Sequence, residues 1–554
     1  MKRRDFLFST IAAGAAVSLM HQVRAHPLRN SIRGSAGRPA AQALRLHPFL
    51  AAHPDAVFIR RTQVTSKLDT MAKQSEGEAL TAELFSADAS GDIPFTNAMA
   101  IKPNLTCTFG TGNTAEGMGI MTDLPFVEGM VAGLSQHGFP AHNMYMREGN
   151  WLGDGYCASE YPVTGVLVDQ LAQRQGIHAF DFPTGRHLND MTLESLQAGT
   201  EVIWRDVHGD GVVFKRIGYL APYNDDDSFL LNVAKFKAHG MGMTLTAKNL
   251  QGMCVAPYIH FCEGLTSLAN RPAHVLADFH ADREQRINAL YARHVAEGIP
   301  RWDRPEPGGG YGMEVWAQRT CDALSVVGPG LHVIEGIYGR NGDGFNGGPG
   351  PGNTPEEFMS NLLIFGRNPL LVDVIGTWLA GHEPGNFGLF HIARERGLCP
   401  TFVPDAIPLY DWNGGEPVSA TLTEQPRTPI LCPYLRRDYD GQHEDQYHLV
   451  DEPFDYSTVS VDRLEALPVK AEIIALQNPV RDVALFELRF PKETHARVEI
   501  YDGMGRRIAV LRDERFNDGS YSVRWTPGRV PAGMYIARLL TPAASVSTRI
   551  VLLR

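Results

Sequence analysis

Hydrophobic and polar positions predict an α/β domain in the middle of the chain. Short apolar runs, each the length of a buried strand, alternate with stretches that repeat apolar residues at helical spacing. The expected strands are 96–101, 143–148, 229–234, 331–337 and 362–371, and the expected helices are 123–136, 163–175, 272–297 and 391–397. A hairpin is expected at 202–216. Strand–helix alternation of this kind is typical of βαβ units, so we expect a mostly parallel sheet.

The pattern changes to strands alone from residue 472. Apolar–polar alternation at 498–510, 519–525 and 531–539 is separated by turn residues, as in an immunoglobulin-like sandwich. The expected fold is therefore a mostly parallel α/β core domain at 93–400 with a C-terminal all-β sandwich at 472–554. Residues 26–92 are expected to be a linker and N-terminal extension with a helix near 66–85, and 401–471 a loop-rich connector.

The first 25 residues have the features of an export signal. An R-R-x-F-L pattern begins at Arg3, an Ala- and Gly-rich run follows, and 23–25 offer a small-residue cleavage site before His26. We expect export by the twin-arginine machinery to the periplasm, the cell surface or the medium. An ordinary secretory signal with two arginines by chance is the alternative. The twin-arginine route carries folded proteins, often around a cofactor, which favours a bound metal or redox group.

Composition excludes two classes of partner. The chain of 554 residues carries a net charge of −11 and has no Lys or Arg block beyond its first residues, which argues against nucleic acid. No apolar run reaches the roughly 18 residues of a membrane span.

The seven cysteines include no C-x-x-C pair, so a ferredoxin-type iron–sulfur cluster is not expected.

The strongest candidate site lies at 230–252. The expected strand 229–234 runs directly into Lys235, Lys237 and His239, and Lys248 and Asn249 follow shortly after. An unpaired lysine costs several kcal/mol to bury, so lysines at a buried strand end need a partner or a task.

Lys102 and Asn104 follow the strand 96–101 in the same manner. In a parallel sheet, ligands bind beyond the carboxyl ends of the strands, so we expect both groups to meet in one cleft. Gathered cations suit a carboxylate or phosphate, and a lysine with a lowered pKa can act as a base or as a Schiff-base nucleophile. His239 and His260 are candidates for proton transfer or metal binding. The alternative is that the lysines pair with carboxylates and only hold strand ends together.

A glycine-rich loop at 338–352 contains a literal G-x-G-x-x-G at Gly342, Gly344 and Gly347. A dinucleotide site requires this pattern to open directly into a helix, whereas here prolines intervene before an expected helix start at 354–357. We therefore expect a loop that closes over a ligand. Asp373 follows the next expected strand.

Four blocks carry a family resemblance: I-K-P-N-L at 101–105, K-x-K-x-H with T-x-x-x-K-N-x-x-G at 235–252, V-I-E-G-I at 333–337 and F-G-R-N-P-L-L-V-D at 365–373. Together they resemble the bacterial family called domain of unknown function 362 over about 95–400. The resemblance implies a shared site but no reaction, and this chain lacks the ferredoxin cassette of some members. Y-D-x-x-G-R, the Val-Arg-Trp strand and P-A-G-x-Y near the C-terminus resemble sorting modules of type IX secretion and flagellar hook-capping proteins.

These observations favour an exported enzyme that acts on a small anionic molecule through a Lys/His cleft. A metal- or iron–sulfur-associated redox protein without turnover of its own, and a cell-surface ligand-binding module, are the alternatives; the sequence identifies no cofactor. The candidate catalytic residues are Lys237, His239, Lys248 and Asn249, the candidate ligand-binding residues are Lys102, Asn104, Gly342, Gly344 and Asp373, and the candidate metal ligands are His239 and His260.

Overall fold

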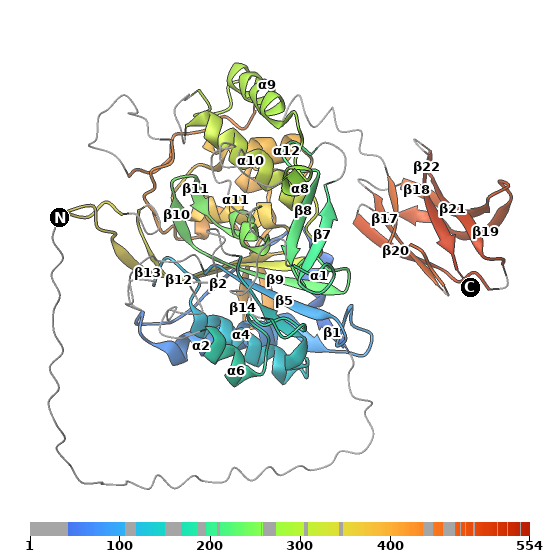
Figure 1. The fold of residues 1–554 in the computed structure, drawn as a ribbon, viewed down its shortest axis with the longest axis horizontal. Coiled ribbons are helices and arrows are strands. Elements are labelled where there is room, and N and C mark those ends of the chain that lie inside the picture. The colour runs from blue at the N-terminus through green and yellow to red at the C-terminus, as the bar shows by residue number, and fades with distance from the viewer. Residues whose placement is uncertain are drawn as a thin grey trace, which may run out of the picture.

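A computed structural model gives the fold (Figure 1). It describes residues 43–105, 118–149, 168–186, 196–207, 211–255, 258, 273–303, 309–342, 347–435, 447–457, 471–476, 478–481, 483–490, 494–517, 519–528, 530–542 and 545–553. The export signal expected at 1–25 lies outside these residues.

An eight-stranded mixed sheet forms the centre of the α/β domain, in the order β15-β14-β2-β13-β12-β9-β5-β6. The strands are β2 (Val57–Arg61), β5 (Ala98–Pro103), β6 (Met144–Met146), β9 (Ser228–Lys235), β12 (Gly330–Arg340), β13 (Glu357–Gly366), β14 (Leu409–Asn413) and β15 (Glu416–Ala420). The β12–β9, β9–β5, β5–β6 and β14–β2 pairings are parallel, and the other three are antiparallel. The expected α/β class with a mostly parallel sheet is confirmed.

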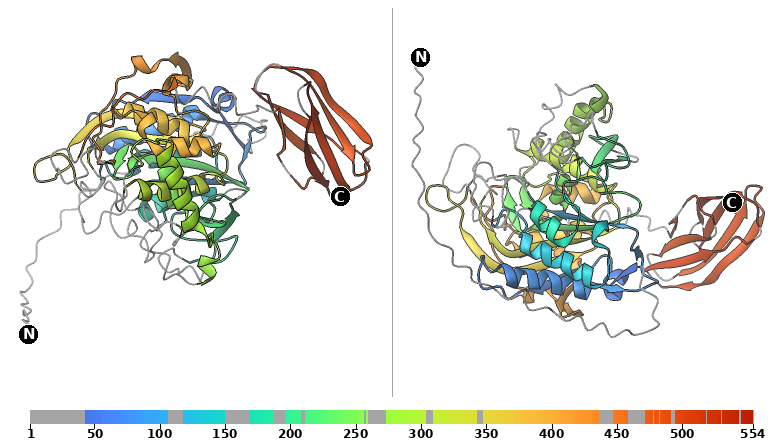
Figure 2. Two further views of the ribbon diagram at one scale, coloured as in Figure 1. Left: turned by 90° about the horizontal axis from the view of Figure 1, so that it is seen from above. Right: turned by 60° about the horizontal axis from the view of Figure 1, so that its bottom comes forward.

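Helices cover both faces of this sheet (Figures 1 and 2). One layer holds α2 (Thr70–Leu84), α4 (Leu124–Gln136) and α6 (Val168–Gln175). The opposite layer holds α8 (Ala273–Leu276), α9 (Arg283–Ala296), α10 (Gly310–Leu324), α11 (Pro369–Leu379) and α12 (Gly388–Glu395). Each layer buries its own apolar cluster against the sheet, with Phe126 and Met130 on one face and Trp316 and Ile375 on the other. Strands buried on both faces explain why their sequences read as continuous apolar runs.

The strand order reverses at β5. The chain passes from β5 to β6 on one side and later returns to β9 and β12 on the other. The carboxyl ends of β5 and β9 therefore flank a topological switch point, the place where open α/β sheets bind ligands. This arrangement brings 102–104 and 235–239 to the same edge of the sheet.

The structure differs from the expected linker and connector at both ends of the domain. Residues 57–61 form β2 inside the main sheet, and 409–420 supply β14 and β15 at its edge. Phe58 of β2 stacks on Phe365 with ring centroids 5.5 Å apart. The strand was missed because its apolar run of three residues ends in Arg60 and Arg61, too short for a periodic signal.

Two further expectations at 272–297 and 354–371 are corrected. The expected single helix is broken into α8 and α9. Residues 354–357 start no helix, because β13 begins at Glu357 and pairs antiparallel with β12. The Asn368 side chain then accepts hydrogen bonds from the backbone N–H groups of Leu370 (3.0 Å) and Leu371 (3.2 Å), so it ends the extended run and caps α11.

The smaller elements complete the domain. They are β1 (Ala43–Leu46), β3 (Phe85–Ala87) and β4 (Ile93–Pro94), which form one small sheet, α1 (Pro48–Ala52), and the antiparallel pair β7 (Val202–Asp206) and β8 (Arg216–Leu220). An antiparallel pair with a first strand at 202–206 is present as expected, but the second strand is β8, which overlaps the expected hairpin at 202–216 only at Arg216.

The C-terminal strands form two antiparallel sheets, as expected for an all-β sandwich (Figure 1). One sheet holds β16 (Glu472–Ala475), β17 (Ala484–Phe490) and β20 (Gly519–Trp525), and the other holds β18 (Thr494–Asp502), β19 (Arg507–Phe516), β21 (Gly533–Leu540) and β22 (Ser545–Leu552). Phe486, Val498 and Leu539 are fully buried between them. Among the helices of the described residues, none has the length and apolar character needed to cross a membrane.

Candidate functional site

Lys235 is the last residue of a strand in the main sheet, and Lys237 is the first residue of a hairpin outside it. β9 ends at Lys235, and β10 (Lys237–His239) then folds back through a tight turn onto β11 (Gly242–Thr244). In this hairpin Lys237 lies opposite Thr244 and His239 opposite Gly242. Gly242 has a φ of +102°, a backbone conformation that side chains other than glycine rarely adopt. The turn therefore fixes the direction in which Lys237 and His239 face.

Lys235 is held by a carboxylate. Its Nζ lies 2.8 Å from Glu335 Oε2, and both side chains are completely buried. Glu335 also accepts hydrogen bonds from the backbone N–H groups of Asp123 (3.0 Å) and Ile337 (2.9 Å). This buried ion pair, with the hydrogen bonds that Glu335 accepts, joins β9, β12 and the start of α4. Lys235 thus has a structural role.

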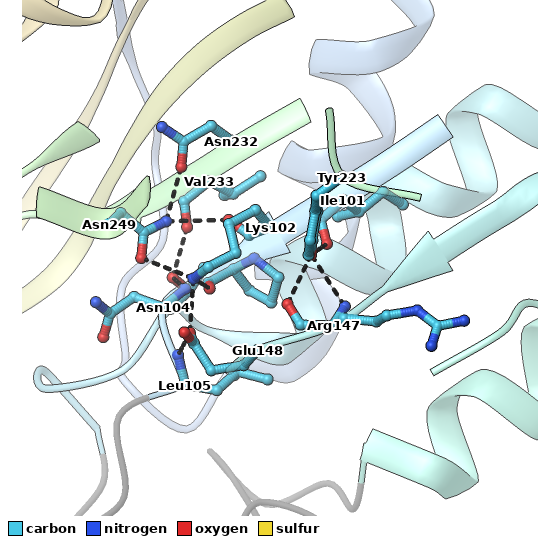
Figure 3. Close-up of polar contacts among 12 residues, drawn as sticks. Ile101, Lys102, Asn104, Leu105, Arg147, Glu148, Tyr223, Asn232, Val233 and Asn249 are labelled. Atoms are coloured by element: carbon cyan, nitrogen blue, oxygen red, sulfur yellow. Dashed lines mark hydrogen bonds and ion pairs between the residues drawn. The ribbon is translucent and has the colours of Figure 1, made fainter. Parts of the chain in front are cut away.

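Lys102 is held in the same way on the other side of the switch point (Figure 3). Its fully buried Nζ lies 2.7 Å from Glu148 Oε2 and donates to the carbonyl of Pro103 (2.6 Å) and to Asn249 Oδ1 (3.2 Å). Burial lowers the pKa of Lys102 and raises that of Glu148, and their mutual attraction opposes both shifts. Glu148 also accepts from the backbone N–H of Leu105 (2.8 Å).

Asn249 connects this pair to the neighbouring strand (Figure 3). Its Nδ2 donates to the carbonyl of Lys102 (3.0 Å) and to Asn232 Oδ1 (2.8 Å). Asn232 Nδ2 in turn donates to the carbonyl of Thr246 (3.0 Å) and contacts His332 Nδ1 (3.0 Å). Asn249 uses both ends of its amide inside the protein, which makes it a positioning residue.

Lys237 differs from both other lysines. It is 3% exposed, and in the described part of the chain no carboxylate lies within ion-pair distance of its Nζ. Its one hydrogen bond there runs to Asn104 Oδ1, at 3.3 Å. Burial lowers the pKa of Lys237 well below its usual range, and the charges of Lys248 and Arg340 lower it further. Both effects favour the neutral amine over the charged ammonium.

Other cationic side chains surround this amine. His239 and Lys248 are half-buried, as is Arg340 at the end of β12. Burial lowers the pKa of His239 well below its usual range, and the charges of Lys248 and Lys237 act in the same direction. These four side chains are called the cation cluster below: Lys237, His239, Lys248 and Arg340. The cluster can attract an anion, and its charges favour the neutral form of the Lys237 amine.

Comparisons with known proteins place these residues in a family. The model of the family described as "Domain of unknown function (DUF362)" matches residues 99–378, half of the chain, and this range includes β9, β12, all of β5 except Ala98, and the whole cation cluster. The chain belongs to this family. No curated protein matches the sequence.

Solved structures share only limited parts with this chain. Latent PorU from Porphyromonas gingivalis is 23% identical over 15% of this chain and 9% of its own, with a TM-score of 0.14. CopC from Methylosinus trichosporium OB3b is 12% identical over 15% of this chain and 93% of its own, with a TM-score of 0.12. PorZ, a surface component of the type-IX secretion system of P. gingivalis, is 17% identical over 26% of this chain and 20% of its own, with a TM-score of 0.12. At these TM-scores the likenesses carry no argument about function.

The remaining site residues expected from the sequence do not all join the cation cluster of the DUF362 domain. Asp373 accepts hydrogen bonds from Thr246 N (2.7 Å), Thr246 Oγ1 (2.6 Å) and Ala247 N (2.8 Å), so it caps α7 (Thr246–Asn249). Burial raises the pKa of Asp373 to about 7, against the effect of these bonds. Gly342 donates its backbone N–H to the Leu431 carbonyl (3.1 Å). Gly344 and His260 lie outside the described residues.

A metal centre was the other use expected of the histidines. Within the ranges that the structure describes, no group of three or more His, Cys, Asp or Glu side chains is arranged to hold a metal ion. Cys254, which follows the K-N-x-x-G block, is buried and forms no disulfide. The expected pairing of His239 with His260 remains a prediction.

Sequence reasoning missed Glu148, the partner of Lys102 in the DUF362 domain. It lies two residues beyond β6 and is the last residue of the strand expected at 143–148, so a carboxylate at the end of an expected strand was the available signal. Arg147 beside it is also buried, with its guanidinium 4.0 Å from the Phe182 ring centroid. Tyr223 OH donates to the carbonyls of Ile101 and Arg147, both at 2.6 Å, and so joins β5 to the end of β6 (Figure 3).

Proposed function

We propose that this protein is an exported enzyme whose DUF362 domain acts on a small anionic molecule at the carboxyl ends of β5 and β9. One observation carries the proposal. Three lysines are buried at this sheet edge, and Lys102 and Lys235 each have a carboxylate partner, whereas Lys237 has none in the described residues. Burying an amine without a counter-ion costs stability, and such costs are typical of functional sites.

The charge around Lys237 supports an anionic ligand. Lys248 and Arg340 act on Lys237 with the same sign of charge, and the chain as a whole carries a net charge of −11. A local excess of cations in an acidic protein is unfavourable until an anion neutralises it. A carboxylate or a phosphate would supply that charge. His239 accepts a hydrogen bond from Met241 N at Nδ1 (3.2 Å), so its Nε2–H can donate a hydrogen bond to such a ligand.

Ligand-induced stabilisation tests this proposal. Thermal unfolding of the full mature chain is measured with phosphate, lactate, pyruvate or citrate at constant ionic strength. We expect at least one anion to raise the midpoint, since a ligand at about 100 times its Kd adds about 2.7 kcal/mol to the free energy of unfolding. Lys248→Ala should lose most of the rise. Lys215→Ala removes an exposed lysine on the β7–β8 connection and should keep it. Absence of any response, or an equal loss in both variants, contradicts the proposal.

Export and surface attachment complete the proposal. The R-R-x-F-L pattern from Arg3 supports transport by the twin-arginine machinery, and the motifs of the C-terminal sandwich support sorting or anchoring. The enzyme would then act in the periplasm, at the cell surface or outside the cell. N-terminal sequencing of protein from those fractions checks this, with a mature start near His26 expected and an intact Met1 contradicting it.

A further inference from the structure

The Nζ atom of Lys237 combines three features that an anion-binding lysine does not need. It is buried, it lacks a carboxylate partner among the described residues, and other cations stand beside it. A lysine that serves only to bind an anion works best when fully charged, whereas burial and like charges favour the neutral amine. A neutral amine is a nucleophile. On the basis of the proposed function, we propose that Lys237 forms an imine with the carbonyl carbon of a small 2-oxo acid.

The hairpin supplies polar groups beside the amine. Lys237 and Thr244 are directly opposed in the β10–β11 register, so their side chains lie on the same face of the hairpin. Thr244 Oγ1 is buried and has no hydrogen-bond partner in the described part of the protein. A buried hydroxyl without a partner costs free energy unless a ligand fills the position. The oxygen of a carbonyl group bound to Lys237 is such a ligand.

The cation cluster explains why the substrate would be an acid. Lys248 and Arg340 act electrostatically on Lys237 from two different elements, α7 and β12. In a 2-oxo acid the ketone carbon is bonded directly to the carboxylate carbon. When these two cations bind the carboxylate, the ketone carbon can therefore lie next to the amine of Lys237. Asn104, which accepts from Lys237 Nζ at 3.3 Å, can orient the nitrogen. A 2-oxo acid, in which a carboxylate stands next to a ketone, matches both the pair of cations and the amine.

The reaction balances without any oxidant or reductant. The nitrogen lone pair of Lys237 forms a bond to the carbonyl carbon, and the C=O π electrons move to oxygen. The nitrogen loses a proton and the oxygen gains one, which gives a carbinolamine. A proton from solvent then lets the oxygen leave as water while the C=N bond forms, and the product is the protonated imine. His239 lies two residues along β10 on the same face, and its Nδ1 accepts a hydrogen bond from Met241 N (3.2 Å), so its Nε2–H can hold the oxygen in place during these proton transfers.

Reductive trapping on the full mature chain tests the inference. The protein is incubated with pyruvate and sodium cyanoborohydride, and the adduct is located by peptide mass spectrometry. We expect about one reduced adduct per chain, on Lys237, forming at least tenfold faster than on exposed lysines such as Lys215. Lactate has the same carboxylate but no carbonyl, so it should slow trapping by competition and leave no adduct.

Two variants and two outcomes keep this inference separate from the proposed function. Lys237→Met should abolish the Lys237 adduct, and Lys248→Ala should reduce its rate at least tenfold while leaving background labelling unchanged. If lactate stabilises the protein but pyruvate never labels Lys237 faster than Lys215, the imine is wrong and the anion site stands. If neither compound binds and no selective adduct forms, both the inference and the proposed function are wrong.

Discussion

Lys237→Met is expected to stabilise the protein, whereas Lys235→Met is expected to destabilise it strongly. Methionine has an unbranched side chain one atom shorter than that of lysine and removes the cost of burying an amine that has no carboxylate partner among the described residues, so a gain of about 1 kcal/mol in the free energy of unfolding is expected. Lys235→Met leaves Glu335 buried without its counter-ion, a loss of about 3–5 kcal/mol. Thermal or urea unfolding of the α/β domain measures both.

The two variants are matched controls for each other. Lys235 and Lys237 stand two residues apart, are both buried, and receive the same substitution. Among the described residues, Lys235 has a carboxylate partner and Lys237 has none, and this difference is expected to separate the effects of the two substitutions. If Lys237→Met destabilises the domain as much as Lys235→Met does, Lys237 has a structural role and the proposed function loses its main support.

Gly252→Ala is expected to have the second large effect. A Cβ atom at this position would collide with Glu148 Oε1 and lie 2.7 Å from Lys102 Cε. The Lys102–Glu148 pair would have to open, and breaking a buried ion pair costs about 3–5 kcal/mol. The glycine of the K-N-x-x-G block is therefore explained by close packing against this pair. Unfolding midpoints and the yield of folded protein measure the loss.

Gly328→Ala provides the control for this prediction. A Cβ there has Asn224 Oδ1 at 3.9 Å as its nearest neighbour, an ordinary van der Waals distance, and the free energy of unfolding should change by less than about 1 kcal/mol. Equal stability of the two alanine variants would mean that Gly252 does not pack on the ion pair as described.

The sequence predicted the place of the site better than its contents. Lysines at the ends of two apolar strands were sufficient to bring Lys102 and Lys237 to one edge of a parallel sheet. Nothing in the sequence distinguished Lys235 from Lys237, because both follow the same strand. The difference arises from strand register, since Lys235 lies directly opposite Glu335 in the β9–β12 pairing and Lys237 lies beyond its last paired residue.

Long-range partners account for most of the other misses. Glu148 reaches Lys102 from 46 positions away, and Asp373 caps α7 from more than 120 positions away. Local periodicity contains no information on such contacts. β2 was missed for a related reason: its short run Val57–Arg61 is a strand because β13 and β14 pair with it, and not because of its own propensity.

Proton uptake on anion binding tests the central claim most directly. Burial and like charges favour the neutral form of Lys237 in the free protein, and an anion bound beside it raises the pKa of this amine, so part of the amine takes up a proton. Calorimetric titration with lactate near neutral pH, repeated in buffers of different ionisation enthalpy, counts the protons. The account predicts uptake of a fraction of a proton per lactate in the wild type, because some neutral amine must remain to attack a bound 2-oxo acid, and much less uptake in Lys237→Met. Binding without proton uptake, or with the same uptake in Lys237→Met, would contradict it.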